Sequence, residues 1–164
     1  MLKEFHNLTP AEQQLMLDAI PLITILVAGA DDDIDEVEIA EAQRLADIRS
    51  FNKKGQTNAY YEKVDNDLTG RIMEMMKELP NALAPRQEAI VAKLSGLNDV
   101  FAKMDEPFGY LYYKSFCSFA KHVAESHGGF LRFMTVGPKE AEVVNLPMLN
   151  AVERPSKIDY PNLP

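Results

Sequence analysis

Apolar residues recur along most of this chain with the spacing of one helical face, and the first such pattern is the strongest. Thr9-Pro10-Ala11-Glu12 combines an N-cap hydroxyl, a proline at the first helical position and a glutamate that completes a capping box. Pro21 removes one backbone donor inside the pattern, which predicts a kink or a split. Residues 22–28 present apolar side chains on all sides, so we expect this helix to be central. The apolar positions of its face are Leu15, Ala19, Leu22 and Leu26.

A second helix is predicted from the capping-box pair Asp35 and Glu38 to about Arg49. One face of this helix is apolar and is made up of Val37, Ala42, Leu45, Ala46 and Ile48. Glu38 and Glu41 fall inside the same apolar arc. A carboxylate that faces a core needs a cation, a hydroxyl or backbone donors as its partner, so these two positions are informative.

Three further apolar patterns predict helices in the middle of the chain. The first covers residues 60–79 with an interruption near Gly70, the second covers residues 90–104, and the third starts after Asp105-Glu106-Pro107 and ends at a glycine-rich cap at 126–129. No segment alternates convincingly with period two. The sequence therefore predicts an all-α fold, a single-domain helical bundle of about six to eight helices.

The C-terminal part of the chain is less regular. A loop is expected over residues 130–137, and Pro138 starts a short helix that is interrupted or kinked at Pro147. Residues 154–164 contain three prolines and predict an extended tail that is either loose or laid on the surface. We therefore assign residues 1–153 to the helical domain and residues 154–164 to a tail.

Charge and cysteine content exclude several classes of function. The formal net charge is -8, which disfavours binding to phosphate backbones, so a nucleic acid is not an expected partner. Cys117 is the one cysteine of the chain, which excludes an intrachain disulfide and every multi-cysteine zinc motif. This usage is typical of a reducing compartment.

The apolar run at residues 19–30 ends in Ala-Gly-Ala and superficially looks like a secretion signal. The residues before it carry Glu4, Glu12 and Asp18 against a single Lys3, and they have the pattern of a capped helix. A run of about twelve residues is also too short to span a bilayer. We therefore predict a buried core helix, no direct insertion into a membrane, and a cytoplasmic location.

The segment from residue 30 to residue 42 holds seven acidic residues and no basic one. So many carboxylates in a compact turn repel one another unless water, amide groups or a cation take up the charge. The first hypothesis is that this segment binds a hard divalent cation, Ca²⁺ or Mg²⁺, since both prefer oxygen ligands. Its candidate metal ligands are Asp31, Asp33, Asp35, Glu38 and Glu41, with Asp32 or Glu36 assisting.

An EF-hand is not supported by this segment. The sixth loop position is Glu36 rather than glycine, and the twelfth is Ala42 rather than a bidentate glutamate. The alternative interpretation needs no metal. In it, the acids interact favourably with the N-terminal end of the following helix, by ~0.3–1 kcal/mol, and the rest form a solvated acidic surface.

Two segments together resemble the tellurite-resistance TerB-like family. Residues 30–38, Ala-Asp-Asp-Asp-Ile-Asp-Glu-Val-Glu, are similar to its Ala-Asp-Gly-x-Ile-Asp-x-x-Glu signature, and residues 123–133 resemble its second signature, a helix that ends in Gly-Gly-Phe. The resemblance covers residues 8–153 in order and spacing. It implies an all-helical domain of two related helical halves, an acidic surface suspected of cation binding, and a stress-response role without known catalysis.

The family's acidic positions fall on Asp31, Asp35 and Glu38 of this chain, and two positions depart from the signatures. Asp32 stands where the family has glycine, and Arg132 stands where the second signature has a small residue. If the glycine serves a left-handed turn in the family, aspartate tolerates that backbone conformation at some cost in free energy. The loop of this chain then differs from the loop of the family.

Catalytic constellations are not found in the sequence. Cys117, His122 and His127 are each five residues apart, a spacing that does not share one helical face well. The chain has no phosphate-binding glycine loop and no nucleophile elbow. We therefore expect a non-enzymatic stress-response module whose acidic turn binds a divalent cation or presents charge to a protein partner, including a membrane-associated one. The alternatives are an adaptor without metal that uses its acidic or aromatic surface, and an enzyme built on Glu38 and Glu41.

Overall fold

The computed structural model describes residues 2–29, 36–51, 55–125 and 143–164, with only the backbone for Val37 and Glu38. These residues form seven α-helices and one short 3-10 helix, and no strand occurs among them, which confirms the predicted all-α fold. The relation between two helical halves stays a prediction. The elements are η1 (Lys3–Phe5), α1 (Pro10–Ala28), α2 (Glu36–Phe51), α3 (Asn58–Asp65), α4 (Leu68–Glu78), α5 (Leu83–Ser95), α6 (Leu97–Lys103) and α7 (Phe108–Glu125).

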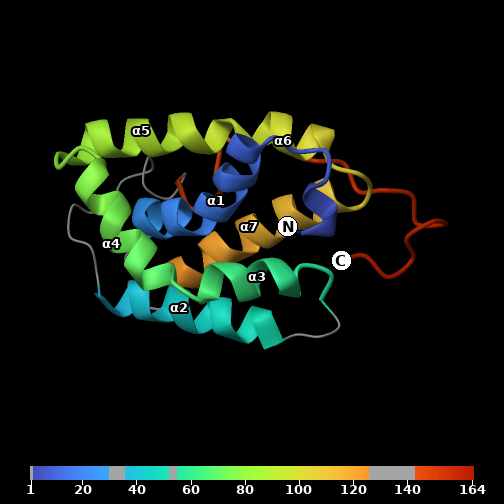
Figure 1. The fold of residues 1–164 in the computed structure, drawn as a ribbon, viewed down its shortest axis with the longest axis horizontal. Helices are drawn as coiled ribbons and strands as arrows, with labels where there is room; N and C mark the ends of the chain where they lie inside the picture. The colour runs from blue at the N-terminus through green and yellow to red at the C-terminus, as the bar shows by residue number, and fades with distance from the viewer. Residues whose placement is uncertain (1, 30–35, 52–54, 126–142) are drawn as a thin grey trace.

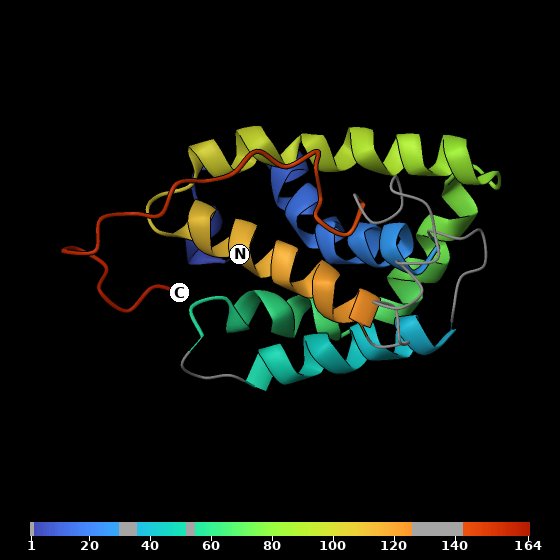
Figure 2. The same cartoon turned by 180° about the vertical axis from the view of Figure 1, so that it is seen from behind.

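The helices are arranged in layers (Figures 1 and 2). Helices α5 and α6 follow one another along one side of the molecule, α2 and α3 lie along the opposite side, and α1 and α7 run between them. Helix α4 crosses one end and links the two outer layers. Helix α1 contacts each of the other α-helices described here. It is therefore the element around which the bundle is built.

The sequence of α1 explains this central position. Every residue from 19 to 28 is buried, so the helix has no solvent-facing side over this length. Its one polar side chain there, Thr24, donates its hydroxyl to the carbonyl of Ile20 at 2.8 Å, as a buried hydroxyl must. The predicted capping box is confirmed, since the amide of Glu12 donates to Oγ1 of Thr9 and the amide of Thr9 donates to the Glu12 carboxylate.

Of the two outcomes predicted at Pro21, a kink or a split, the structure has the kink. Helix α1 runs unbroken through Pro21, although it changes direction about midway along its length (Figures 1 and 2). A proline removes one hydrogen bond and crowds the preceding turn, which bends a helix without necessarily ending it. The hydroxyl of Tyr60 also donates to the carbonyl of Met16 at 2.7 Å, which satisfies a backbone group in the turn before the proline.

Two of the predicted helical segments are each divided, one of them near an interruption that the sequence predicts. The apolar residues between 60 and 79 lie on α3 and α4, and the break between Asp65 and Leu68 is close to the predicted interruption near Gly70. Gly70 is instead inside α4, where a Cβ atom would lie 2.2 Å from Oδ1 of Asp67. Residues 90–104 are divided at Gly96, which faces α1, because a Cβ there would lie 3.1 Å from Cδ2 of Leu15. Because these glycines have no side chain, neighbouring atoms can lie close to the helix backbone, and the spacing of apolar residues does not predict this.

The predicted tail is tied to the helical domain by a few hydrogen bonds, while its middle projects away from the bundle (Figures 1 and 2). Nη2 of Arg154 donates to the carbonyl of Leu163 at 2.9 Å, and the hydroxyl of Tyr110 donates to the carbonyl of Pro164 at 2.6 Å. The hydroxyl of Tyr160 donates to the carbonyl of Glu106. Residues 154–164 are thus tied to the N-terminal end of α7. The predicted cap and loop at 126–137 and the helix start at Pro138 lie outside the described residues.

Helix α1 is also the one described helix that is long and apolar enough, by length and composition, to cross a membrane. In the fold, 61% of its most apolar stretch is buried among the other helices. The core helix of a bundle has the same length and composition, so this signal is weak. The predicted location of the protein stays a prediction.

The central position of α1 can be tested with two isoleucines. Ile23 is 0% exposed and Ile158 is 91% exposed. We expect Ile23→Ala to lower the free energy of unfolding by ~2–5 kcal/mol, because it removes buried methyl groups and leaves a cavity. Ile158→Ala should change it by less than ~0.5 kcal/mol. Denaturant titration followed by circular dichroism measures both, and equal losses would contradict the central role of α1.

Candidate functional site

The predicted cation site lies largely outside the described residues. This holds for Asp31, Asp33 and Asp35, while Glu38 is described only by its backbone in the first turns of α2. The structure therefore does not test whether these carboxylates converge. In the described part of the chain, no group of three or more histidine, cysteine, aspartate or glutamate side chains is placed to hold a metal ion.

Glu41 is the one predicted ligand whose side chain is described, and it has a partner. Arg44, one turn later on α2, donates from Nε to Oε2 of Glu41 at 2.8 Å and from Nη2 to Oε1. The Glu41 side chain is 22% exposed. The Arg44 guanidinium holds the pKa of Glu41 below its ordinary value. The expectation that this carboxylate needs a partner is confirmed, and the partner is an arginine of its own helix.

Neither Cys117 nor His122 has surroundings that would activate a nucleophile. Cys117 is half-buried, and burial raises the pKa of its thiol, which is the opposite of what a reactive thiolate requires. Nδ1 of His122 lies 2.7 Å from the carbonyl of Ser118 on the same exposed helix surface. His127 is outside the described residues.

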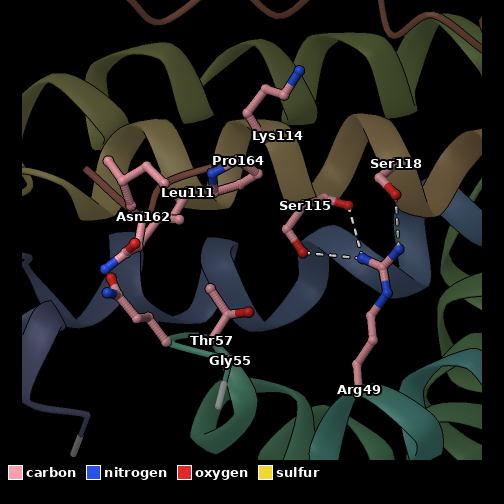
Figure 3. A pocket seen from close by; sticks show the side chains of 11 residues that line it. Arg49, Gly55, Thr57, Leu111, Lys114, Ser115, Ser118, Asn162 and Pro164 are labelled. Atoms are coloured by element: carbon pink, nitrogen blue, oxygen red, sulfur yellow. Dashed lines mark hydrogen bonds between the residues drawn. The ribbon is translucent and has the colours of Figure 1, made fainter. Parts of the chain in front are cut away.

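A pocket with both polar and apolar lining lies between α2, the turn before α3, α7 and the end of the described tail (Figure 3). Its volume is about 560 Å³, a size that suits a small-molecule ligand. Arg49 enters it from α2, Thr57 from the turn before α3, and Ser115 and Ser118 from α7. The other lining residues are Gly55, Gln56, Leu111, Lys114, Asn162, Leu163 and Pro164.

Arg49 is the best-fixed polar side chain of this pocket. Its Nη1 donates to the hydroxyl of Tyr61 at 2.8 Å and to the carbonyl and hydroxyl oxygens of Ser115 at 2.9 and 3.0 Å. Its Nη2 donates to the hydroxyl of Ser118 at 3.1 Å (Figure 3). One guanidinium thus joins α2 to α3 and α7.

Two aromatic rings complete the surroundings of Arg49. Its Cζ lies 5.2 Å from the centroid of the Tyr61 ring and 5.4 Å from that of Phe119, distances at which a guanidinium and a ring attract one another. Burial raises the pKa of Tyr61, so its phenol stays neutral and its oxygen lies 2.7 Å from the Ser115 hydroxyl. The pocket therefore offers fixed hydrogen-bond donors and positive charge, and no carboxylate, histidine or cysteine side chain lines it.

Sequence reasoning missed this pocket, although one signal for it was present. Arg49 stands three, four and seven residues after Ala46, Leu45 and Ala42, which are all buried, so it lies on the inward face of α2. An arginine in an apolar stripe needs partners, as Glu41 does. The identity of those partners could not be read, because Ser115 is 66 residues further along the chain.

Comparisons of this chain with protein-family models, with curated proteins and with solved structures give no match. The resemblance to the TerB-like family therefore rests on the two sequence motifs and stays a prediction.

The structural role of Arg49 can be tested against a neighbouring arginine of the same helix. Arg49→Lys keeps the positive charge but loses the planar fork, so we expect the free energy of unfolding to fall by ~1–3 kcal/mol. Arg44→Lys is the control, since Arg44 is 60% exposed and its ion pair with Glu41 contributes only ~0–1 kcal/mol. Denaturant titration measures the free energy of unfolding of both variants. A loss in Arg49→Lys no larger than in Arg44→Lys would show that the fork does not hold α2 in place.

Proposed function

We propose that this protein is a non-enzymatic interaction module that docks a partner protein on the outer face of α2. The supporting observation is a pair of apolar side chains, Ile48 and Phe51, that are 49% and 73% exposed and stand three residues apart on one helix. Residues with this spacing are neighbours on a helix surface. The other large exposed apolar side chains, Met73 and Ile158, lie on α4 and on the tail.

The exposure of Ile48 also corrects the sequence analysis, which placed this residue on the buried face of its helix. The inward face is instead centred on Ala42, Ala46 and Arg49, so Ile48 falls at its edge and turns outward. The small alanines let α2 approach its neighbours closely and leave no room for a larger apolar stripe.

The charge of the chain favours a basic partner. Glu36 and Asp47 are exposed on α2 and the segment just before the helix is acidic, while Arg44 is exposed on the same helix and Lys53 and Lys54 follow it in sequence. A second copy of this chain would bring two molecules of formal charge -8 together, which opposes self-association. An amphipathic helix with lysine or arginine beside its apolar face complements both the exposed apolar pair and the net negative charge of the chain.

A synthetic helix-forming peptide of leucine and lysine at helical spacing is the probe for this face. We expect fluorescence anisotropy to show saturable binding that weakens about tenfold in the double variant Ile48→Ser, Phe51→Ser, because the buried apolar contact is lost. Met73→Ser is the matched control and should bind as the wild type does. A scrambled peptide of the same composition controls for charge alone. Unchanged affinity in the double variant, or no binding by the wild type, would overturn the proposal.

A second candidate function is binding of a divalent cation by the acidic turn, supported by the seven carboxylates at residues 30–42 and by the TerB-like motifs. Glu41 is already held by Arg44, so on this proposal the main ligands are Asp31, Asp33, Asp35 and Glu38. The stress-response role that the family resemblance implies belongs with this candidate, because a cation sensor or buffer serves such a response.

Calorimetric titration of Ca²⁺, Mg²⁺, Mn²⁺ and Zn²⁺ into chelator-treated protein tests the second candidate. We expect one of these ions to bind the wild type, and Asp31→Asn and Asp35→Asn to weaken its binding, because each removes a charged oxygen ligand. Asp159→Asn, a change in the tail, is the control and should leave binding unaltered. Equal absence of heat in all proteins at millimolar metal would eliminate the cation site.

A further inference from the structure

The pocket at Arg49 concentrates positive charge in an acidic protein. The chain has 25 acidic and 17 basic residues, yet the side chains that line this pocket include Arg49 and Lys114 and no carboxylate. The pocket is on the inward side of α2, whereas Ile48 and Phe51 face outward. A ligand there would therefore be separate from the partner proposed above.

Arg49 differs from two other arginines of the described chain in the charge of its partners. Arg44 pairs with Glu41, and Arg71 pairs with Asp18 and Glu74. The acceptors of Arg49 are the neutral oxygens of Tyr61, Ser115 and Ser118, and no described carboxylate lies within ion-pair distance of it. A half-buried cation without a counter-ion is costly, and an anion bound beside it would offset that cost.

The geometry of Arg49 also leaves donors for such an anion. The guanidinium forms its hydrogen bonds through Nη1 and one N–H of Nη2, so Nε–H and the second N–H of Nη2 bond to no residue that the structure describes. The four bonds already made and the two rings fix the group in place. Donors held in position before a ligand arrives bind an anion without the entropy cost of ordering them.

The remaining lining gives the ligand its other features. Lys114 is exposed at the rim, and its ammonium is directed away from Arg49 in Figure 3, so its flexible stem can bring a second positive charge to the ligand. Thr57 adds a hydroxyl. Leu111, Leu163 and Pro164 form an apolar wall, and the Pro164 carbonyl oxygen already accepts from Tyr110. The volume of about 560 Å³ leaves room for an organic group beyond the anion itself.

We propose that this pocket binds the phosphate monoester of a small organic molecule, with the phosphate at Arg49 and Ser118 and the organic group against Leu111 and Leu163. A phosphate monoester carries close to two negative charges at neutral pH, which matches one fixed and one mobile cation. A carboxylate carries one charge and leaves Lys114 without a role. Nothing in the pocket is placed to cleave the ester, so the proposal is binding and not hydrolysis.

Calorimetric titration with phenyl phosphate tests the proposal, with inorganic phosphate and benzoate as comparison ligands. We expect saturable binding of phenyl phosphate, and weaker binding of both others, because one lacks the organic group and the other lacks the second charge. Lys114→Gln should weaken phenyl phosphate binding about tenfold, and Arg49→Lys at least as much. Lys121→Gln is the matched control, since Lys121 is an exposed lysine of α7 outside the pocket.

Each outcome decides the proposal. No saturable binding at millimolar phenyl phosphate would overturn it, and so would equal affinity in Lys114→Gln and Lys121→Gln. If benzoate binds as tightly as phenyl phosphate, the assignment to a phosphate is overturned. If inorganic phosphate binds as tightly as phenyl phosphate, the proposed contact of the organic group with the apolar wall is overturned. If Arg49→Lys fails to fold by circular dichroism, Lys114→Gln carries the decision, because Lys114 makes no hydrogen bond within the described residues.

Discussion

The burial of α1 on all sides is the constraint on which the rest of this fold depends. A helix that is apolar around its whole circumference is stable in water only when other helices surround it. In this bundle α1 contacts each of the other described α-helices, and residues 19–28 are shielded throughout. The layers on either side, α5 with α6 and α2 with α3, are the arrangement that covers this one segment (Figures 1 and 2). Thr24, the only polar side chain in that segment, donates its hydroxyl to a carbonyl of the same helix.

Helix α2 packs mainly against α3 and α7, and this position explains both faces of the helix. Ala42 and Ala46 are 0% exposed and allow α2 to approach its neighbours closely. At the end of this small-residue stripe the long side chain of Arg49 reaches across to α7, where serine oxygens and aromatic rings receive it. The same rotation of the helix turns Ile48 and Phe51 to solvent. One helix thereby presents an apolar pair outward and a cation inward.

The ligands that we propose for the two faces of α2 would bind by different physical interactions. The partner proposed for the outer face would bind by removing apolar surface from water, and the net negative charge of the chain favours a basic partner. On the inner face, association depends on a charge whose protein partners are all neutral, so the gain is electrostatic and sensitive to salt. The acidic turn before α2 would add a third kind of chemistry, coordination by hard oxygen atoms. All three proposed binding sites involve α2 or the acidic segment directly before it.

The sequence by itself determined that this chain is all-α, that α1 is central, that a capping box starts it, and that an inward Glu41 needs a partner. Each of these follows from local spacing: the period of apolar residues, a cap within one turn, or a charge inside an apolar arc. Only the tertiary structure decided where α3 and α4 divide, what Gly70 and Gly96 accommodate, and that Arg49 meets Ser115. Those features depend on contacts between segments far apart in the chain, and apolar periodicity states which face of a helix is buried but not what it is buried against.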